Sequence, residues 1–238
     1  MTHIYYPVKV SGARKSGLEQ GRLDTMTNIA ATYIDHMGSD LSVVNAARVS
    51  FGKKSHWVEG HKEGHPSIAP VLAPRDEKLI QYLAQHKHLS PFGHAFASFH
   101  VKAPIFVARQ LVKHKFLRWN EISRRYVSDE PEIYLPDEWR MAADDVKQGS
   151  SDKVVRENAS WRFEYLAVCR EAVEQYNYMV REGIAPEQAR MILPQATMTE
   201  WYWSGSLDAF ASMCKLRCAP DTQYESRIVA DQISSELG

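Results

Sequence analysis

The feature that most constrains the fold is a long amphipathic segment between residues 152 and 182. Apolar side chains recur there at helical spacing and mark one wide face of a helix, at Val155, Trp161, Tyr165, Val168, Cys169, Ala172, Val173, Tyr176 and Val180. Gly183 follows, and glycine is typical of the position just after a helix. The segment predicts one helix over 152–182 in a helix-rich fold.

Apolar spacing and helix-end residues predict further helices at 39–51, 75–87, 104–115, 186–193, 207–216 and 222–233. Thr222 and Glu225 have the spacing of a capping box at the start of the last one. Alternating residues predict a strand at 94–103, and 28–38 is either a strand or a short helix. Residues 117–126 read as a loop, and 128–151 as a surface excursion. We expect an α+β fold, a mostly helical single domain over 1–238 with a small antiparallel sheet.

Charge and cysteine content exclude several classes of protein. The 238 residues carry a formal net charge of zero, which argues against binding nucleic acid or a membrane surface broadly. The N-terminus lacks the apolar core of a signal peptide, and no run reaches transmembrane length. The three cysteines are odd in number and scattered, so we expect no disulfide framework. These features predict an intracellular, cytoplasmic protein.

Residues 52–75 are rich in Gly, Pro and His and show no periodicity, so we interpret them as a loop insertion. His56, His61 and His65 raise the hypothesis of a zinc site, since three imidazoles can bind zinc. The spacing of the three histidines does not match a known zinc-binding motif, and the sequence does not indicate a carboxylate that would complete the site. A solvated loop is the favoured interpretation, and no metal site is predicted.

Positive charge is concentrated between Arg109 and Arg125, where six Lys or Arg and one His accompany a single acid, Glu121. A solvated helix face normally mixes its charges. Pro104 opens a helix here, on which Arg109 and Lys113 are one turn apart and share a face. The segment therefore predicts a local site for an anionic ligand that accepts hydrogen bonds.

This basic segment resembles the signature of the flavin-dependent thymidylate synthases, Arg-His-Arg followed by seven residues and Ser. Here Lys113, His114 and Lys115 stand in the Arg-His-Arg positions, and Ser123 follows at the expected distance. Five further blocks resemble the family in the same order: AARVSFG, HLSPFGH, FHVKAPIFVARQ, EQARMILP and KLRCAPDTQYE. The resemblance covers most of residues 41–233, and it implies a fold of the thymidylate synthase-complementing protein type.

The resemblance implies an enzyme that converts dUMP to dTMP. Methylenetetrahydrofolate is the carbon donor, FAD is the bound cofactor and NADPH is the reductant. It also implies a homotetramer whose active sites are built by several subunits. Because the cofactor carries the difficult chemistry, no cysteine nucleophile is required. The expected partners are small molecules and other copies of the chain, without nucleic acid or membrane.

The resemblance also assigns roles to residues. The positions expected around dUMP are Arg109, Gln110, Lys113, Glu121, Ser123, Arg124, Arg125, Arg190 and Arg217. Arg217 is the expected catalytic residue, because a guanidinium stays charged while it stabilises an anion that develops on the uracil N3. The positions expected to contact FAD are Ser90, Lys113, His114, Lys115, Asn120, Glu121, Ser206 and Ser212. His88 is expected near the approach of the folate or the nicotinamide.

The departures from the family pattern gather on the flavin side. Lys-His-Lys keeps the charge of Arg-His-Arg but loses planar bidentate geometry. Asp208 replaces an expected cation and would repel a pyrophosphate that faced it, and Gly93 replaces a usual glutamate. Arg118 and Trp119 offer a different route to the flavin, through a cation for its phosphates and a stacking face.

Two alternatives stay open. One is a diverged relative that methylates or hydroxymethylates a pyrimidine deoxynucleotide, either dCMP or dUMP. The other is a non-catalytic nucleotide-binding or single-strand-binding protein that has kept the basic cleft without its flavin. Single-strand binding needs basic and stacking residues spread along a groove, whereas here they occupy one short segment.

Overall fold

The centre of the protein is a four-stranded antiparallel sheet with the strand order β1-β4-β8-β5. A computed structural model describes residues 28–62, 65–126, 129–144 and 149–237. The strands are β1 (Ala30–Met37), β4 (Phe96–Pro104), β5 (Leu117–Glu121) and β8 (Met198–Ser206). The two inner strands, β4 and β8, pair along their full lengths. The sheet thus joins segments from the beginning, the middle and the end of the chain.

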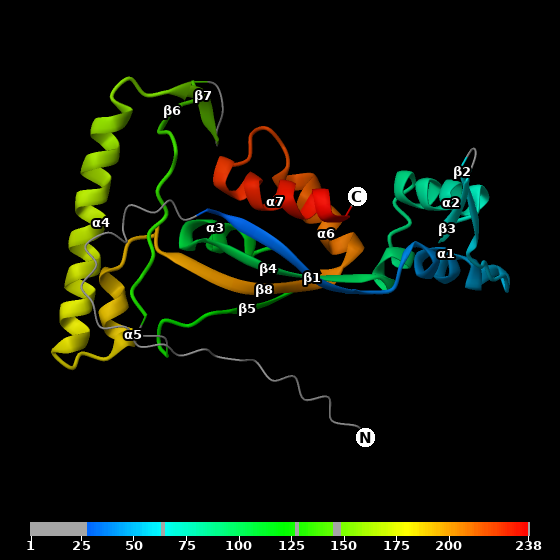
Figure 1. Ribbon diagram of the computed structural model, residues 1–238, viewed down its shortest axis with the longest axis horizontal. Coiled ribbons are helices and arrows are strands. Elements are labelled where there is room, and N and C mark those ends of the chain that lie inside the picture. Colours follow the sequence, from blue (N-terminus) through cyan, green and yellow to red (C-terminus); the bar gives the residue numbers. More distant parts are fainter. Residues whose placement is uncertain (1–27, 63–64, 127–128, 145–148, 238) are drawn as a thin grey trace.

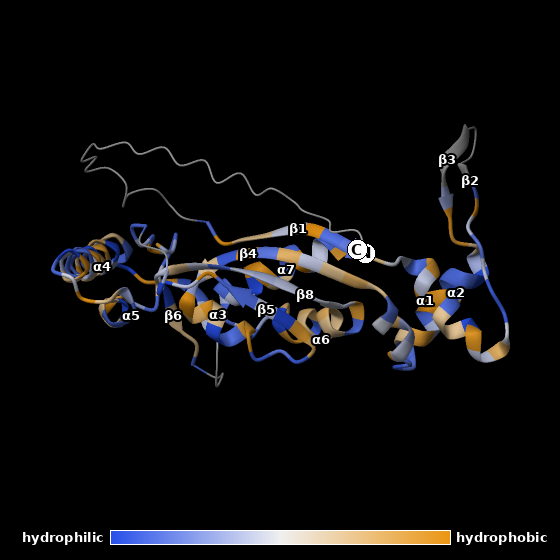
Figure 2. Cartoon of the chain, turned by 90° about the horizontal axis from the view of Figure 1, so that it is seen from below, coloured by the Kyte–Doolittle hydropathy of each residue, from blue (hydrophilic) through white to orange (hydrophobic). Residues whose placement is uncertain are grey.

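One face of the sheet is apolar because its strands alternate. In β4 the residues Phe99 and Val101 are fully buried, and in β8 Trp201 and Trp203 are almost fully buried. Three helices lie on this side of the sheet in both views (Figures 1 and 2): α3 (Ile105–Leu111), α6 (Leu207–Arg217) and α7 (Tyr224–Leu237). Their buried side chains complete the main core, which includes Leu111, Phe210, Met213, Val229 and Ile233.

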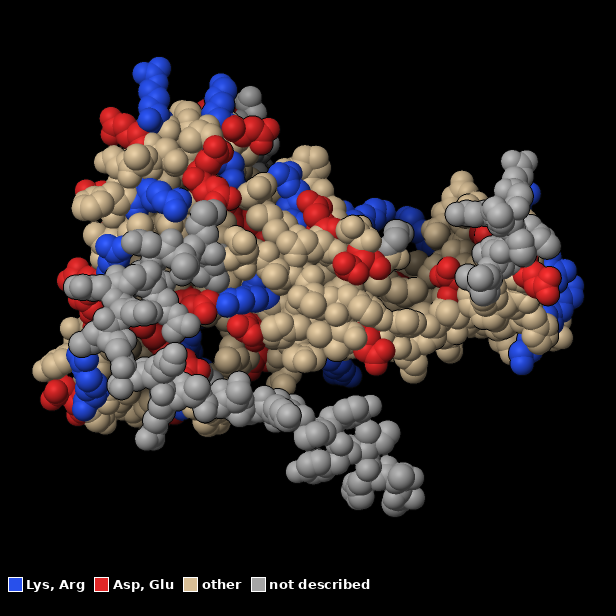
Figure 3. All heavy atoms as spheres, in the orientation of Figure 1, with Lys and Arg blue, Asp and Glu red and all other residues tan. Residues whose placement is uncertain are grey.

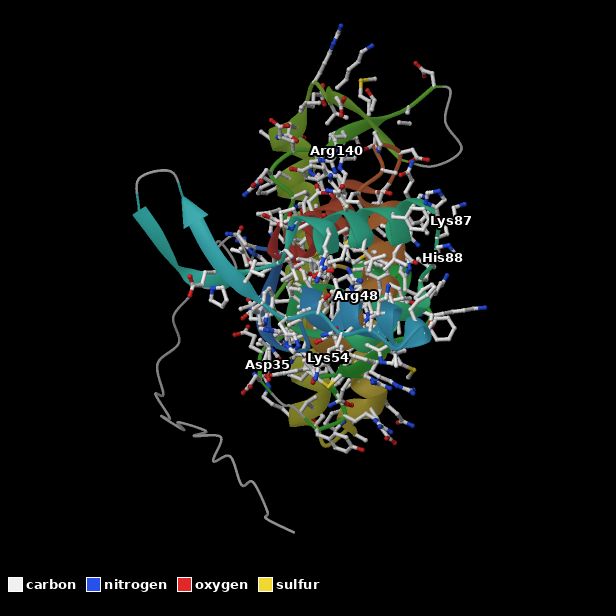
Figure 4. All side chains as sticks on the ribbon, turned by 90° about the vertical axis from the view of Figure 1, so that its right-hand side faces the viewer. Asp35, Arg48, Lys54, Lys87, His88 and Arg140 are labelled. Atoms are coloured by element: carbon white, nitrogen blue, oxygen red, sulfur yellow. The ribbon has the colours of Figure 1, made fainter. Side chains whose placement is uncertain are left out.

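A smaller lobe lies at one end of the sheet (Figure 1) and contains α1 (Asp40–Arg48), α2 (Pro74–Gln85) and a hairpin of β2 (Val58–Lys62) and β3 (His65–Val71). A buried ion pair holds α1 to α2: Arg48 donates to Oδ1 of Asp76, which is fully buried. The Ser55 hydroxyl donates to the same oxygen over 3.1 Å. Figure 4 views the protein from this end, with Arg48 and Lys54 labelled on the lobe.

The opposite end carries α4 (Asn158–Arg181) and α5 (Pro186–Ala189), followed by the turn η4 (Arg190–Ile192). A second hairpin of β6 (Arg140–Ala142) and β7 (Ser150–Val154) lies near the start of α4, at the end of that helix away from α5 (Figure 1). A minor core forms here from Ile133, Cys169, Val173 and Ala196. The turns η2 (Val49–Phe51) and η3 (Ser90–His94) complete the elements.

The predicted α+β fold with a small antiparallel sheet is confirmed, and so are the strand at 94–103 and the helices that begin near residues 40, 75 and 207. Within residues 28–38, Ala30–Met37 form a strand rather than a helix. No helix among the described residues is both long enough and apolar enough to cross a membrane. That the domain covers 1–238 stays a prediction.

Several expectations were wrong. The long helix begins at Asn158 rather than near residue 152, because residues 150–154 pair with β6 as strand β7. Residues 117–121 form an edge strand of the main sheet instead of a loop. The capping box is not made: the Thr222 hydroxyl donates to the Leu216 carbonyl, and Glu225 pairs with Arg140. Residues 58–62 and 65–71 form a hairpin where a loop insertion was expected.

Candidate active site

The site is built around a cavity of about 710 Å³ between the main sheet's helices and the β6–β7 end of the protein. Aromatic side chains form much of its wall, namely Phe106, Tyr134, Trp139 and Tyr165. Charged and amide groups complete it, among them Gln110, Arg140, Lys215, Arg217 and Glu225. A concave space with apolar walls and a few polar groups is typical of a small-molecule site.

Gln110 and Arg217 reach this cavity from two different helices. Gln110 lies near the end of α3, a helix that begins after Pro104 and is anchored by the buried Val107, Ala108 and Leu111. Arg217 is the last residue of α6, where Phe210 and Met213 are buried against the sheet. The structure therefore brings together two residues that are 107 positions apart and were both predicted for one substrate.

His114 lies against Arg217, just beyond the end of α3. The Arg217 Nε–H donates a hydrogen bond of 3.0 Å to His114 Nε2. The imidazole also meets Trp203 edge to face, with the ring centroids 6.4 Å apart. Burial, and then the charge of Arg217, lower the pKa of His114, and burial lowers the pKa of the Arg217 guanidinium. An arginine nevertheless stays charged in a protein.

Glu121 ends β5 with both carboxylate oxygens engaged. The Thr199 hydroxyl donates to Oε1 over 2.7 Å, and the Trp119 indole N–H donates to Oε2 over 3.1 Å. Trp119 is in turn stacked on Trp201, with the ring centroids 4.3 Å apart and the planes 18° apart. These contacts fix the orientation of an exposed carboxylate before any ligand arrives.

The other residues predicted for dUMP lie outside the cavity wall. Arg109, Lys113, Arg125 and Arg190 are exposed, and Ser123 and Arg124 are half-buried. Ser123 Oγ accepts from the Arg125 side chain over 3.4 Å, Arg124 donates to the Asp129 carbonyl, and Arg190 donates to the Glu187 carbonyl over 3.2 Å. Within one chain, these cations do not line the same space as Gln110 and Arg217.

The positions predicted to contact the flavin occupy separate places. Lys115 and Asn120 are exposed at the two ends of β5, while Ser206 is the residue before α6 and Ser212 is exposed on that helix. Ser90 is exposed in η3, which packs against α6. A side chain added at Gly93 would meet only Asp208 Oδ1, at 3.9 Å. That oxygen is buried without a hydrogen-bond partner among the described residues.

These surroundings fit a flavin in part. The open space over Gly93 suits a planar group, and an unpaired buried carboxylate oxygen suits a ligand N–H or O–H. The same carboxylate does not suit a phosphate. The surroundings of Gly93 and Asp208 therefore fit an uncharged, hydrogen-bonding part of a flavin better than its pyrophosphate, and the predicted contacts of Lys113 and Lys115 with FAD stay a prediction.

His88 lies on the lobe, beside Lys87 at its edge in Figure 4. Its ring lies parallel, within about 20°, to that of Tyr82, with the centroids 6.1 Å apart, and Tyr82 is stacked on His86 at 4.0 Å. This exposed group of flat rings is separate from the cavity. Its place on the lobe leaves the expected role near the folate or the nicotinamide as a prediction.

Arg118 and Trp119, the two residues suggested for an alternative flavin contact, both lie on β5. They are consecutive residues of β5, so their side chains leave opposite faces of the sheet. One face of the Trp119 ring is already stacked on Trp201. A flavin contact by either residue stays a prediction.

The metal hypothesis also gains no support. The described residues contain no cluster of three or more His, Cys, Asp or Glu placed to hold a metal ion. The side chains of His61 and His65 lie outside the described residues, and His56 is exposed before β2. The preference for no metal at this loop stays a prediction.

Sequence reasoning missed one wall of the cavity. Tyr134, Trp139 and Arg140 belong to the stretch that was interpreted as a surface excursion, because it is rich in Asp, Glu and Pro. Ile133 and Leu135 are buried and alternate with Tyr134, which was a signal of a partly buried extended segment.

The site's charge is local. On the face shown in Figure 3, acidic and basic side chains are interspersed, and no large area carries one sign. This distribution agrees with the zero net charge. The guanidinium of Arg217 in an aromatic cavity can stabilise an anionic heterocycle, and the amide of Gln110 can orient one.

Comparison with known proteins identifies the family. The family described as thymidylate synthase complementing protein matches residues 32–238. The flavin-dependent thymidylate synthase of Thermus thermophilus is 39% identical over 205 residues, which cover 84% of this chain and 68% of that protein. The one from Thermosipho melanesiensis is 35% identical over 206 residues, or 84% and 82% of the two chains.

A solved structure agrees with the sequence relatives. The UMP/dUMP methylase PolB from Streptomyces cacaoi, bound with 5-Br dUMP, has a TM-score of 0.74 to this chain. The two are 29% identical, and the match covers 89% of this chain and 91% of that one. On its sequence and its fold, this chain belongs to the thymidylate synthase complementing protein family, the family of the flavin-dependent thymidylate synthases.

Proposed function

We propose that the protein is a flavin-dependent thymidylate synthase that converts dUMP to dTMP. Methylenetetrahydrofolate provides the carbon, NADPH is the final reductant and FAD is the cofactor. The observation that carries the proposal is the meeting of Gln110 and Arg217 at one aromatic-walled cavity. The names of the sequence relatives and the dUMP analogue bound to the structural neighbour support the same substrate.

The roles of the chain's residues follow from their chemistry. The Gln110 side chain offers both a donor and an acceptor, which suits the edge of a uracil ring. Arg217 stabilises negative charge on the ring nitrogen as carbon 5 becomes nucleophilic. Glu121, already fixed by Thr199 and Trp119, holds a hydrogen-bonding group of the bound substrate or cofactor. When bound, the flavin supplies hydride transfer.

The remaining residues predicted for dUMP are proposed to act from a second subunit. Arg125 and Arg190 are too exposed to enclose a phosphate alone, and with the half-buried Ser123 they lie away from the cavity wall of their own chain. A neighbouring copy in a homotetramer would bring its Arg125 and Arg190 to the nucleotide phosphate, where forked guanidinium donors bind best.

A cytoplasmic location belongs to this proposal, and all three cysteines are free thiols.

One second candidate has an observation in its favour. The structural neighbour is described as a methylase of both UMP and dUMP and was also solved with 5-Br UMP. Methyl transfer to UMP is therefore the alternative reaction to test beside dCMP and hydroxymethyl products.

The test uses the purified protein with FAD added. It is incubated with methylenetetrahydrofolate, NADPH and, separately, dUMP, UMP or dCMP, and the nucleotide product is identified by mass spectrometry. We expect dTMP from dUMP, in a yellow preparation, and no product from an Arg217→Ala variant that still binds flavin. A protein that binds flavin and nucleotide but forms no methylated product from dUMP contradicts the proposal, and methylation of UMP alone selects the second candidate.

A further inference from the structure

The hydrogen bond between Arg217 and His114 has a defined direction. An arginine Nε–H can only donate, so His114 Nε2 must accept at the observed 3.0 Å. A nitrogen that accepts carries no proton. The contact therefore requires a neutral imidazole with its proton on Nδ1.

The surroundings of His114 favour this neutral form. The ring is half-buried and packs edge to face on Trp203 of β8, a side chain that does not ionise. The charged group that faces it from α6 is Arg217, and Lys113 and Lys115 flank it in the chain. A proton on the ring would add a cation beside cations, and burial would cost that charge its hydration.

The contact also determines how Arg217 is presented. Among the described residues no carboxylate forms an ion pair with Arg217, so its side chain is held by His114 alone through Nε. With Nε engaged, the two terminal nitrogens of the guanidinium are left for a ligand in the cavity that Arg217 lines. An acidic partner would hold the arginine more tightly but would also neutralise part of the field that the substrate needs.

We propose that neutral His114 is a positioning residue for the reaction: it accepts from Arg217 Nε and aims an uncompensated guanidinium at the substrate ring. This inference rests on the proposed function for the identity of that ring. It differs from a direct flavin contact in that His114 acts through Arg217. It also makes the enzyme sensitive to acid, because a proton on Nε2 removes the acceptor.

The direction of the pH effect follows from the neutral form being the active one. Burial and Arg217 lower the pKa of His114 below its ordinary 6.5, so the acceptor is intact at neutral pH and is lost only on the acid side of that value. We therefore expect kcat to fall as the pH drops below about 6.5, the ordinary value of a histidine.

Two variants and one control test the role. In His114→Gln the side-chain oxygen can accept from Arg217 and does not titrate, so we expect the acid loss of kcat caused by this position to disappear. His114→Leu removes the acceptor, and a misplaced catalytic group of this kind costs on the order of 10- to 100-fold in kcat. His36→Gln, which changes an exposed histidine on β1, is expected to leave the pH profile unaltered.

A second measurement needs no turnover. In protein carrying ¹⁵N-labelled histidine, the His114 signals, assigned by their loss in His114→Gln, report whether Nδ1 or Nε2 carries the proton. We expect the Nδ1-protonated neutral form at pH 7 in the protein without substrate. A proton on Nε2 at pH 7 overturns the inference even if the enzyme makes dTMP.

The outcomes separate this inference from the proposed function. A wild-type protein that makes no methylated product, yet shows the predicted His114 tautomer and loses it on acidification, contradicts the proposed function and keeps the Arg217–His114 contact. A protein that makes dTMP, with His114→Gln showing the same acid loss as the wild type or His114→Leu keeping full kcat, refutes the role of His114.

Discussion

Phe116 adopts a backbone conformation that bulky residues rarely take. Its φ is +66°, in the left-handed region, and its ring is 82% exposed beside Lys115. A left-handed residue with a Cβ costs about 1–2 kcal/mol, while glycine loses roughly 0.5–1 kcal/mol more on folding. We expect Phe116→Gly to stabilise the protein by about 0.5–1 kcal/mol, measured by urea unfolding.

The same variant reports on function. Strained residues concentrate at functional sites, and an exposed aromatic ring held in this way suits a contact with a ligand or a second subunit. Phe116→Gly should therefore lose flavin retention or assembly while gaining stability. If the variant gains stability and still retains flavin and assembles, the strained backbone of Phe116 has no function. If the variant loses stability, the backbone of Phe116 is not strained. Phe116→Leu, which keeps the strain and most of the apolar area, is the matched control.

Asp76 and Arg48 determine the stability of the small lobe. Burial acts to raise the pKa of Asp76, but its bonds with Arg48 and Ser55 outweigh burial, and the pKa is lowered from 3.8. Removal of one partner from a buried ion pair typically costs about 3–5 kcal/mol. We expect Arg48→Met to raise amide exchange throughout α1 and α2, whereas Lys54→Met, at an exposed position, should not.

The sign of the acid effect is also defined. Because the folded pKa of Asp76 is depressed, its contribution is complete above 3.8 and is lost as the pH falls through the folded value. The wild-type lobe should thus open in acid, and Arg48→Met should show a smaller acid dependence than the wild type. An equal dependence in both would mean that other carboxylates control the lobe.

At the residue scale the sequence predicted identities better than contacts. The family blocks led to Gln110 and Arg217, and both line the cavity. They did not lead to the Arg217–His114 bond, because the two residues are 103 positions apart and only the packing of α6 against β8 brings them together. No local pattern in the Lys-His-Lys segment encodes that partner.

Gly205 allows β5 to pair closely with β8. A Cβ on this residue would lie 2.6 Å from Leu117 Cδ2 and 2.9 Å from the Phe116 carbonyl oxygen, so the backbone of β5 would have to move. We expect Gly205→Ala to destabilise the protein by about 1–3 kcal/mol in urea unfolding, the range for overpacking. Gly93→Ala, whose Cβ meets only Asp208 Oδ1 at 3.9 Å, is the control and should change stability little.

Arg140 attaches the β6–β7 hairpin to α7. Its guanidinium donates to Ser150 Oγ and to Glu225 Oε1, both over 2.9 Å, and lies 4.0 Å from the centre of the Tyr224 ring. A charge-assisted bond of this kind contributes about 1.5–3 kcal/mol. We expect Glu225→Leu to raise amide exchange in β7 and to speed nucleotide release from the cavity that both residues line.

The control for that prediction is Asp152→Asn, which removes a carboxylate from an exposed position of β7. It should leave both amide exchange and nucleotide release unchanged. Unchanged exchange in Glu225→Leu would show that the hairpin is held by its backbone contacts, such as the Val155 N–H to the Trp139 carbonyl, rather than by the ion pair.

At the element scale most helices were predictable, and two strands of the main sheet were not. α2 and α6 show clear periodicity and end residues. β5 was not predicted because the charged and polar residues in its sequence, LRWNE, suggested a loop. β8 was also not predicted, although Glu200 and Tyr202 alternate with the buried Trp201 and Trp203. Strand pairing is a long-range property, so a five-residue edge strand gives little local signal.

The proposed division of the site between two subunits leads to a prediction for the whole assembly. If one chain provides Arg217 and another provides Arg190, then Arg217→Ala and Arg190→Ala chains are each inactive alone. When the two variants are refolded together in equal amounts, we expect roughly a quarter of wild-type activity. By chance, about a quarter of the shared sites then receive an intact Arg217 from one chain and an intact Arg190 from the other. Light scattering of the wild type should show a tetramer.

Activity that stays absent in the mixture would place both residues on one chain's site and contradict the shared arrangement. A double variant carrying both substitutions, mixed with wild type, controls for simple dilution. Exposed apolar residues on α4 are consistent with a covered surface, since Trp161 is 58% and Phe163 70% exposed in the single chain.

The strand order β1-β4-β8-β5 has a consequence for how the chain is made. The edges of β4 and β5 that face the middle of the sheet have no partner until residues 198–206 leave the ribosome. Unpaired edges are templates for association with other chains. Nascent chains stalled before residue 198 should therefore aggregate or recruit chaperones, whereas chains that include α7 should fold without that help.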